Sequence, residues 1–256
     1  MSEQNAQTVK VAIITGGSRG LGRSTVLSLA RRGVDSIFTY HSNAAEAKNV
    51  VDLVAAEGRT AIAYQLDSGE IAAFDDFVCQ VKDGLATLGV QYFDYLVNNA
   101  GTSLHKSIAE TTEADLDAIY NVHFKGVFFL TQKLLPLIND GGRIVNISSG
   151  LARFSFSGSS AYASMKGAVE VFTRYLAKEY GHKITANTVA PGAIATDFSG
   201  GMVRDNPEIN KQVASATAMG RVGVPEDIGP MIAALLGDEN RWVTGQRIEV
   251  SGGMLL

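Results

Sequence analysis

A tyrosine and a lysine, Tyr162 and Lys166, stand four residues apart in a segment whose pattern favours a helix. Residues 160–177 have apolar positions at helical spacing and contain no proline. On a helix, residues four apart lie on one face, one turn from each other. A cation about 5 Å from a phenol, at an effective dielectric of about 20, favours the phenolate by about 3 kcal/mol, or about two pKa units. The spacing therefore predicts an acid/base pair with a lowered tyrosine pKa, although the same spacing also arises by chance on amphipathic helices.

A glycine-rich turn near the N-terminus indicates where a phosphate group would bind. The apolar run of residues 9–15 predicts a buried strand, and the turn of residues 16–22 follows it, before a helix that ends near Arg32. Missing Cβ atoms let such a turn bend sharply and approach a pyrophosphate at the helix N-terminus. The spacing differs from the commoner G-x-G-x-x-G pattern, so the position after the first strand carries the prediction. The predicted cofactor contacts in this turn are Gly16, Ser18, Arg19, Gly20 and Leu21.

The end of the second predicted strand bears on which nicotinamide cofactor fits. An NAD site usually has an acid there for the ribose 2′-hydroxyl, whereas an NADP site needs cations or neutral donors. Residues 38–43 contain no acid, and they include His41 and Ser42. Arg19 can offer a guanidinium fork to a 2′-phosphate. NADP(H) is therefore favoured and NAD(H) stays possible, since Arg19 and His41 are also typical of ordinary solvated surfaces.

Strand-like and helix-like segments alternate along the whole chain. Strands are predicted at residues 9–15, 35–40, 60–66, 93–97, 143–147, 184–189 and 246–250. Helices are predicted after the glycine turn to about residue 32 and at residues 44–57, 71–88, 112–138, 160–177 and 225–236. This order predicts an α/β fold, a single doubly wound parallel sheet of Rossmann-like type with helices on both faces. We expect residues 1–256 to form one dinucleotide-binding catalytic domain.

Two of these segments carry more detailed expectations. Thr112 and Asp115 have the spacing of a capping box, so a long helix is predicted to begin there and to run to Ile138, with Pro136 ending or bending it. Residues 191–216 are glycine-rich and without clear periodicity. They are predicted to be irregular and to form a mobile substrate lid over about residues 192–218.

Composition narrows the classes of protein that fit. The 256 residues are 46% hydrophobic with a formal net charge of −4, which favours one large core and argues against a nucleic-acid partner. Cys79 is the single cysteine, which fits a reducing cytoplasm and, with four scattered histidines, leaves no cluster of zinc-ligand spacing. The polar residues 1–7 predict no signal peptide. The longest apolar stretch, residues 126–138, is too short for a membrane span.

Several motifs in order make the chain resemble the short-chain dehydrogenases/reductases, the family of the 3-oxoacyl-[acyl-carrier-protein] reductases and many bacterial carbonyl reductases. The likeness covers essentially the whole length, which makes it far more specific than any single motif. The matching positions are the turn that begins at Thr15-Gly16, the run Asn98-Asn99-Ala100-Gly101, Ser149, the pair Tyr162 and Lys166, Pro191-Gly192 and Ser251-Gly252-Gly253.

The resemblance implies catalytic roles for three residues. Tyr162 would be the acid/base, and Lys166 would lower its pKa and hold the nicotinamide ribose. The family's serine precedes the tyrosine by thirteen residues, which places it at Ser149. Ser149 follows the fifth predicted strand, where doubly wound sheets bind ligands, and its hydroxyl would bond the substrate oxygen. Its neighbour Ser148 is the competing choice.

The resemblance also implies further contacts with the cofactor. Asn99 would lie near the adenosine ribose, and Asp67 would meet the adenine edge. Ile194 and Thr196, which follow Pro191 and Gly192, match positions that contact the carboxamide and the pyrophosphate.

One position departs from the family's pattern. The family usually has an asparagine three residues before a glycine of the long helix, where it holds a water in a proton relay from the lysine. Counting back from Gly126 places His123 there. Histidine can both donate and accept, so it can serve the relay itself. Asn121 is the alternative, but two residues apart on a helix means about 200° of rotation, so only one of the two can face the site.

An NADPH-dependent carbonyl or 3-oxoacyl reductase is the function that the resemblance implies. An NAD-dependent secondary-alcohol dehydrogenase and a cofactor-sensing binding protein on the same scaffold are the alternatives. The substrate is expected to be a small carbonyl or alcohol compound, shaped by residues 151–160, which include Phe154 and Phe156, and by the lid. Family habit and the apolar residues 126–138 imply a homo-oligomer, a tetramer or a dimer.

Overall fold

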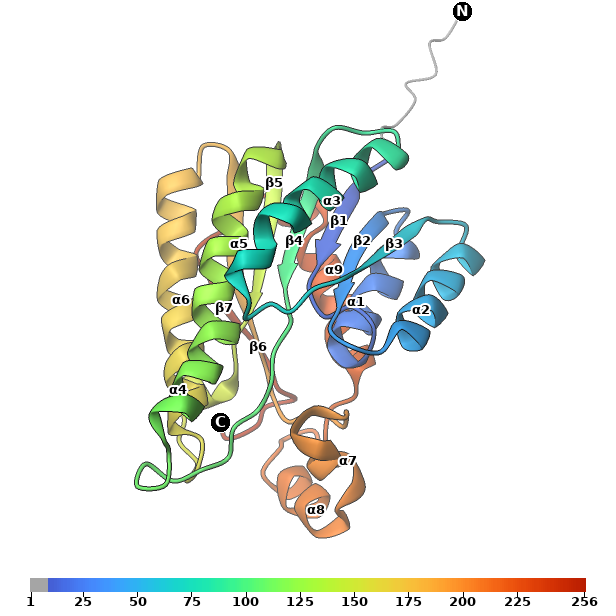
Figure 1. Cartoon of the computed structure of the whole chain (residues 1–256). Coiled ribbons are helices and arrows are strands. Elements are labelled where there is room, and N and C mark those ends of the chain that lie inside the picture. The colour runs from blue at the N-terminus through green and yellow to red at the C-terminus, as the bar shows by residue number, and fades with distance from the viewer. Residues whose placement is uncertain (1–8) are drawn as a thin grey trace, which may run out of the picture.

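Seven parallel strands form one sheet in the order β3-β2-β1-β4-β5-β6-β7 (Figure 1). The structure is a computed structural model that describes residues 9–256, so the stretch of residues 1–7, for which no signal peptide was predicted, lies outside the described residues. The strands are β1 Val11–Ile14, β2 Asp35–Tyr40, β3 Ala61–Gln65, β4 Phe93–Asn98, β5 Ile138–Ile147, β6 Ile184–Pro191 and β7 Arg247–Val250.

Strand β1 shows why helices must cover both faces of this sheet. Ala12 and Ile14 point into one apolar cluster, and Val11 and Ile13 point into the other. All four side chains are fully buried. Burying a valine or isoleucine side chain contributes about 1.5–3 kcal/mol, and an uninterrupted apolar strand gains this on both faces only when each is covered.

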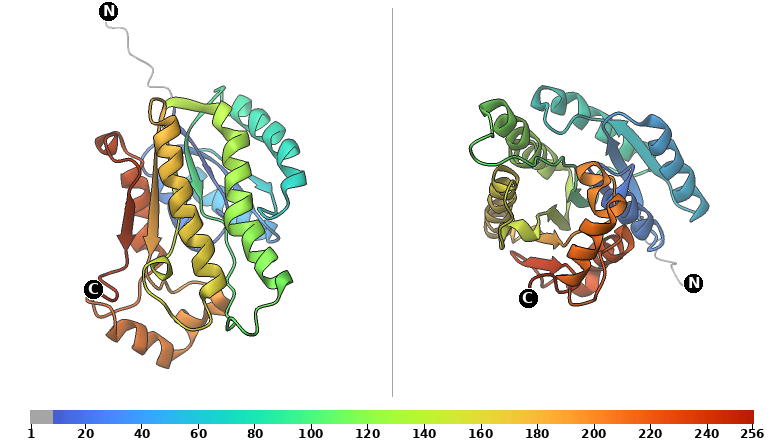
Figure 2. Two further views of the ribbon diagram at one scale, coloured as in Figure 1. Left: turned by 90° about the vertical axis from the view of Figure 1, so that its left-hand side faces the viewer. Right: turned by 90° about the horizontal axis from the view of Figure 1, so that it is seen from below.

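The helices lie in two layers, one on each face. Helices α1, α2 and α9 pack against one cluster, and α3, α5 and α6 pack against the other. Figure 2 shows α5 and α6 running side by side. The rings of Phe128 on α5 and Phe172 on α6 lie 4.8 Å apart, centroid to centroid. The helices are α1 Gly20–Ala30, α2 Ala44–Ala56, α3 Phe74–Thr87, α4 Glu113–Tyr120, α5 Gly126–Leu134, α6 Ser160–Tyr180, α7 Met202–Asp205, α8 Pro207–Ser215 and α9 Pro225–Leu235. The predicted doubly wound α/β fold is confirmed.

The strand order reverses next to β1. Strand β2 pairs with β1 on one side, and β4, which comes later in the chain, pairs with it on the other. In an open parallel sheet, ligands bind in the crevice outside the carboxyl ends of the strands at such a reversal. The chain segments that leave β1, β4, β5 and β6 are therefore the ones that can form a site.

The long helix predicted to begin at Thr112 and to end at Pro136 is confirmed, and it contains one irregular turn. Helix α4 does begin with a capping box, in which Thr112 Oγ1 accepts from the Asp115 N–H at 3.2 Å. A π-helical turn, Asn121–Lys125, then joins α4 to α5 without a break in the helical backbone. Pro136 has no N–H to continue the helix, and β5 already begins at Ile138, earlier than the predicted residue 143.

The segment after β6 is also more regular than predicted. Residues 191–216 were expected to be irregular, but they contain α7 and α8. Asn206 caps α8, with Oδ1 accepting from the Glu208 and Ile209 N–H groups at 3.0 and 3.2 Å, and Pro207 occupies the first helical position. In Figure 1 these two short helices project below the carboxyl edge of the sheet.

Two absences hold for residues 9–256. None of the helices there has both the length and the apolar character needed to cross a membrane. In the same range, His, Cys, Asp and Glu side chains form no group of three or more that could hold a metal ion. Cys79 is exposed and is a free thiol.

Candidate active site

The glycine-rich turn connects β1 to α1 at the carboxyl edge of the sheet. Gly16 and Gly20 have φ values of 67° and 54°, which other residues rarely adopt. A Cβ on Gly22 would lie 2.1 Å from the Gly16 carbonyl oxygen and 2.6 Å from Asn99 Nδ2. The turn therefore requires glycine at these positions, and its backbone stays bare on the side where a cofactor is expected.

Polar side chains from three strand ends hold the backbone of this turn. Thr15 Oγ1 accepts from the N–H groups of Asn99 and Ala100, both at 2.9 Å. Asn99 Nδ2 donates to the Thr15 carbonyl at 2.8 Å and to the Gly16 carbonyl at 3.1 Å. The Gly16 N–H donates to Thr39 Oγ1 at 3.1 Å. Asn99 thus lies against the turn.

The N-terminus of α1 suits an anion. Arg19 is the N-cap residue, and its side chain accepts no hydrogen bond from the first turn of the helix. The first N–H groups of a helix carry a partial positive charge, and here no side-chain cap occupies them. A Cβ on Gly20 would meet Thr196 Cγ2 at 3.6 Å, so Thr196 lies over the same point. These residues fit the pyrophosphate of a nicotinamide dinucleotide, which Ser18, Gly20, Leu21 and Thr196 would hold.

The other residues predicted around the adenosine end lie at the ends of β2 and β3. Tyr40 pairs with Gln65 in the sheet, which brings His41 within 3.6 Å of Asp67, measured from Nε2 to Oδ2. Ser42 is exposed beside His41. Arg19 is also exposed, and its guanidinium lies 3.9 Å from Asp197 in the segment after β6. No acid ends β2, and the side chains of Arg19, His41 and Ser42 are all exposed.

Tyr162 and Lys166 lie in the first two turns of α6, as predicted. Lys166 Nζ lies 5.6 Å from the centroid of the Tyr162 ring. It donates a hydrogen bond of 2.7 Å to the Ile147 carbonyl at the end of β5. Lys166 is buried, and the Tyr162 ring is half-buried. The two groups are close, but the ammonium is directed at a backbone carbonyl.

The predicted lowering of the Tyr162 pKa is wrong for this structure. Burial raises the pKa of Tyr162 to about 12, and the hydrogen bond with Ser149 only partly opposes this rise. Burial also lowers the pKa of Lys166 to about 7. Desolvation disfavours the charged form of both groups, and here it outweighs the attraction between them. The phenol is consequently protonated near neutral pH.

Ser149 lies just past the end of β5 and faces Tyr162. Its hydroxyl interacts with the Tyr162 phenol and accepts from the Leu151 N–H at 3.2 Å. Ser148 points away from that pair, because its Oγ donates to Glu170 Oε1 at 2.6 Å. Of the two adjacent serines, only Ser149 has its hydroxyl at the tyrosine.

His123 comes from the π-helical turn and lies beside the tyrosine. The two rings meet edge to face, with centroids 5.1 Å apart. Nε2 lies 2.8 Å from the Thr102 carbonyl, while Nδ1 is buried without a hydrogen-bond partner. Burial, together with the nearby charge of Lys166, lowers the pKa of His123 to about 3, so the ring is neutral. Asn121 instead lies against Gly69, so the structure brings His123 and not Asn121 to the tyrosine.

The segment after β6 lies beside the site residues already described. Pro191 ends β6, and a Cβ on Gly192 would lie 2.8 Å from Ser251 Cα, so the chain passes tightly here. Ile194 forms a bridge to Gly223. The Phe198 ring then lies 6.0 Å from the Tyr162 ring, centroid to centroid.

Comparison with known proteins places this geometry in a family. A family model described as enoyl-(acyl carrier protein) reductase matches residues 16–255. The hydroxynaphthalene reductase-like protein Arp2 of Metarhizium brunneum is 36% identical over 256 residues, covering 95% of this chain and 94% of the relative. A solved short-chain dehydrogenase/reductase from Serratia marcescens is 35% identical with a TM-score of 0.89, covering 96% of this chain and 98% of its own.

The chain belongs to the short-chain dehydrogenase/reductase family. It is an NAD(P)-dependent oxidoreductase of that family, and its solved relatives include the angucycline C-6 ketoreductase LanV with bound NADP, 32% identical over 96% of this chain and 95% of that chain, with a TM-score of 0.91. The predicted family is thereby confirmed. The roles of the individual residues remain proposals.

Two contacts of this short-chain dehydrogenase/reductase were missed from the sequence. The backbone of Thr102 lies against His123 Nε2. Thr102 directly follows the Asn98–Gly101 run, and that position in the sequence could have indicated it. Phe198 was assigned to the lid, but no sequence signal indicated that its ring packs beside Tyr162.

Proposed function

We propose that this chain reduces a ketone to a secondary alcohol with NADPH. The observation that carries the proposal is the grouping of Ser149, Tyr162 and Lys166 at the carboxyl end of β5, on the same edge of the sheet as the glycine turn. A hydroxyl, a protonated phenol and an ammonium at one point can bind a carbonyl oxygen and give it a proton.

Ser149 and Tyr162 act on the substrate oxygen in this proposal. The carbonyl oxygen lies between the two hydroxyl groups, and both donate hydrogen bonds to it. Burial raises the pKa of Tyr162 to about 12, so the phenol holds its proton at neutral pH and donates it as negative charge develops on the oxygen. Ser149 stabilises that charge. The cofactor, when bound, supplies the hydride.

Lys166 and His123 then return a proton to Tyr162. The Lys166 pKa of about 7 lets it exchange a proton near neutral pH. His123 Nε2 lies 2.8 Å from the Thr102 carbonyl oxygen and 3.1 Å from the Thr102 nitrogen, while the buried Nδ1 has no partner. In the tautomer that we propose, the proton is on Nε2 and bonds to the carbonyl, and Nδ1 is then an acceptor. We assign Nδ1 to a proton relay with Lys166, in the place where the family usually has asparagine. Lys166 would also hold the nicotinamide ribose.

NADPH is the proposed cofactor because of the groups at the adenosine end. Arg19, His41 and Ser42 are exposed there, and β2 ends without an acid. A guanidinium pairs well with a phosphate dianion. LanV binds NADP, as does a solved short-chain dehydrogenase from Burkholderia cenocepacia that is 35% identical. In this proposal Asp67 and Asn99 lie along the adenosine, and Ile194 meets the carboxamide.

Aromatic side chains indicate an apolar ketone as substrate. Phe198 lies beside Tyr162, and Phe154 and Phe156 pack edge to face at 5.6 Å in the turn after β5. The curated relative Arp2 is named hydroxynaphthalene reductase-like, and naphthalene is a fused-ring compound, while the solved relative LanV is named an angucycline C-6 ketoreductase. We therefore place fused-ring aromatic ketones beside 3-oxoacyl thioesters as candidate substrates.

We also propose a cytoplasmic homo-oligomer, a tetramer or a dimer. Phe124, Phe128 and Phe172 stack on the outer side of the π-turn, α5 and α6. Tyr175 on the same helix α6 is 62% exposed. The three phenylalanines are half-buried, and together with the exposed Tyr175 they favour burial against a second copy.

A panel of substrates tests the proposal. The purified protein is offered NADPH or NADH with aliphatic ketones, fused-ring aromatic ketones, 3-oxoacyl thioesters and an enoyl thioester, and the product is isolated. In a second set it is offered NADP⁺ or NAD⁺ with secondary alcohols. We expect a secondary alcohol, formed faster with NADPH. Oxidation of secondary alcohols with NAD⁺ alone would favour the NAD-dependent dehydrogenase. Tight cofactor binding without turnover on any member would favour the cofactor-sensing protein.

A further inference from the structure

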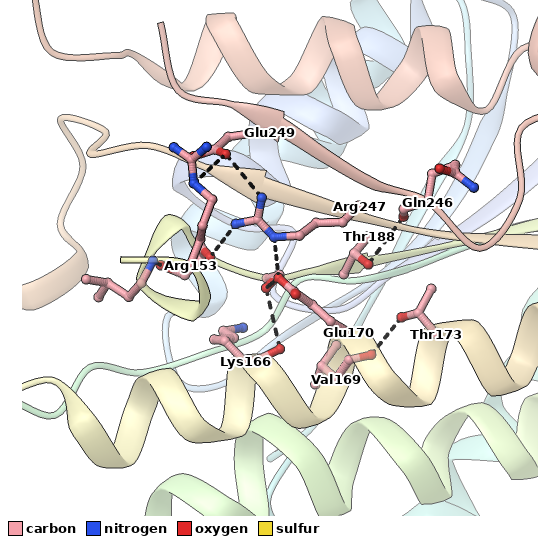
Figure 3. A network of polar contacts seen from close by, with 12 residues as sticks. Arg153, Lys166, Val169, Glu170, Thr173, Thr188, Gln246, Arg247 and Glu249 are labelled. Atoms are coloured by element: carbon pink, nitrogen blue, oxygen red, sulfur yellow. Dashed lines mark hydrogen bonds and ion pairs between the residues drawn. The ribbon is translucent and has the colours of Figure 1, made fainter. Parts of the chain in front are cut away.

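Four charged side chains of alternating sign lie next to one another (Figure 3), in the order Arg153, Glu249, Arg247 and Glu170. Arg247 on β7 donates from Nε to Glu170 Oε1 at 2.7 Å and from Nη1 to Glu249 Oε2 at 3.1 Å. Arg153 Nε lies 3.3 Å from the same Glu249 oxygen. Strand β7, helix α6 and the turn after β5 are thus joined through one guanidinium.

This group differs from the ion pairs on the protein surface. The side chains of Arg247, Glu170 and Glu249 are 22%, 13% and 19% exposed, whereas those of the exposed pair Lys48 and Asp52 are 73% and 61% exposed. Exposed pairs contribute about 0–1 kcal/mol, whereas removing one partner of a buried pair leaves an uncompensated charge. Removing the Arg247 side chain should therefore leave Glu170 and Glu249 with uncompensated charge and should destabilise this part of the protein.

The network contacts the catalytic turn directly. Arg247 Nη2 donates to the Ser149 carbonyl at 3.1 Å. Glu170, which Arg247 holds, accepts from Ser148 Oγ at 2.6 Å. Each nitrogen of the guanidinium consequently has its own acceptor, on α6, on β7 or on the backbone of Ser149. A planar fork of this kind fixes direction as well as distance.

We propose that Arg247 is a positioning residue for carbonyl reduction. It fixes the backbone of Ser149, with Glu170 fixing the neighbouring Ser148, so that the Ser149 hydroxyl is held at the Tyr162 phenol. The proposal rests on the assigned role of Ser149. Arg247 itself makes no hydrogen bond to Tyr162, Lys166 or the glycine turn among the described residues, and the contact by which we assign its effect is the one to the Ser149 carbonyl.

The test measures kcat in a double-mutant cycle of Arg247→Met and Ser149→Ala. Arg247→Met is expected to lower kcat about 10- to 100-fold, because a displacement of about 1 Å can cost that much. The Michaelis constant for NADPH should stay within about threefold, since the turn that would bind the pyrophosphate is remote from Arg247. In the Ser149→Ala protein the same substitution should cost less than about twofold, because the group that it positions is already gone.

An equal loss in both backgrounds would overturn the proposal and make Arg247 merely structural. A Ser149→Ala protein with unchanged kcat would instead refute the assigned role of Ser149, so the two failures are distinguishable. Arg31→Met is the matched control, since Arg31 forms an exposed pair with Glu57 at 2.9 Å, and its kcat and melting temperature should not change.

Arg247→Lys keeps the test decisive if Arg247→Met does not fold. A lysine retains the positive charge between Glu170 and Glu249 but lacks the fork that also reaches the Ser149 carbonyl. We expect it to restore the melting temperature while leaving kcat about tenfold low, with that loss absent in the Ser149→Ala background. Full recovery of kcat with lysine would show that only charge is needed and would contradict positioning.

Discussion

The glycine turn after β1 and the catalytic turn after β5 lie on the same edge of the sheet, but they are held in different ways. At the glycine turn, Thr15, Thr39 and Asn99 bond to backbone groups. At the catalytic turn, Ser148 bonds to Glu170, and Glu170 bonds to Arg247. The first turn is shaped by backbone conformation, and the second depends on side chains that bond to one another.

The buried residues next to the two turns also differ in polarity. Strand β1 is apolar and fully buried, while under the catalytic turn Asn98, Asn146 and Thr173 form a buried chain with hydrogen bonds of 2.7 and 2.8 Å. Asn98 Oδ1 is buried without a hydrogen-bond partner, so the geometry of this network depends on the bonds that its other atoms make. We infer that the glycine turn after β1 loses its structure when a substitution prevents its backbone from turning. The catalytic turn after β5 loses its structure or its activity when a charged group or a hydroxyl is removed.

Lys166→Met should lower kcat strongly. It also shows whether activity and stability at the catalytic turn depend on the same group. Loss of the ammonium should lower kcat by at least about 10³-fold, because proton return and cofactor positioning both depend on it. Burial lowers the Lys166 pKa to about 7, so folding works against this charge and the variant should not lose unfolding free energy at pH 7. Steady-state kinetics and urea unfolding measure the two effects, and an active variant would contradict this account.

Gly22→Val attacks the cofactor end without touching a catalytic group. A Cβ at this position would lie 2.1 Å from the Gly16 carbonyl oxygen, so the turn must move. We expect a loss of about 3 kcal/mol or more of unfolding free energy, or a loss of NADPH binding if the turn rearranges instead. Gly167→Ala is the control, because a Cβ there meets nothing within 4 Å. Normal stability and binding in Gly22→Val would contradict the described turn.

His123→Asn should change the acid stability of the catalytic end. Burial lowers the His123 pKa from 6.5 to about 3, so between these values the unfolded chain binds the extra proton and stability falls as the pH falls. Between pH 7 and pH 5 this should cost the wild type about 2 kcal/mol, and the variant should be spared that loss. Urea unfolding at both pH values measures it. Equal pH dependence in the two proteins would show that His123 is not buried as described.

Arg19→Ala should give the smallest effect and bears on the cofactor end alone. Arg19 is exposed, so its contribution to a 2′-phosphate is modest. We expect the ratio of kcat/KM for NADPH to that for NADH to fall about tenfold, or about 1.4 kcal/mol, while the rate with NADH stays the same. An unchanged ratio would remove Arg19 from the choice of cofactor.

The same contrast explains what could be predicted from the sequence. The glycine turn, the Tyr162–Lys166 spacing and the alternation of elements are local patterns, and each was predicted in its place. The pKa of Tyr162 was not, because it depends on burial by the whole fold. The link from Arg247 to Glu170 joins residues 77 apart in the chain, and no local pattern indicates it.

The most direct test of the account is the turnover of Tyr162→Phe, measured together with its affinity for NADPH. Phenylalanine keeps the ring that packs against His123 and Phe198 but has no proton to give. We predict that kcat falls by several orders of magnitude, about 10³-fold or more, while NADPH binds as in the wild type. Turnover close to that of the wild type would show that Tyr162 is not the acid and would contradict the proposed reaction.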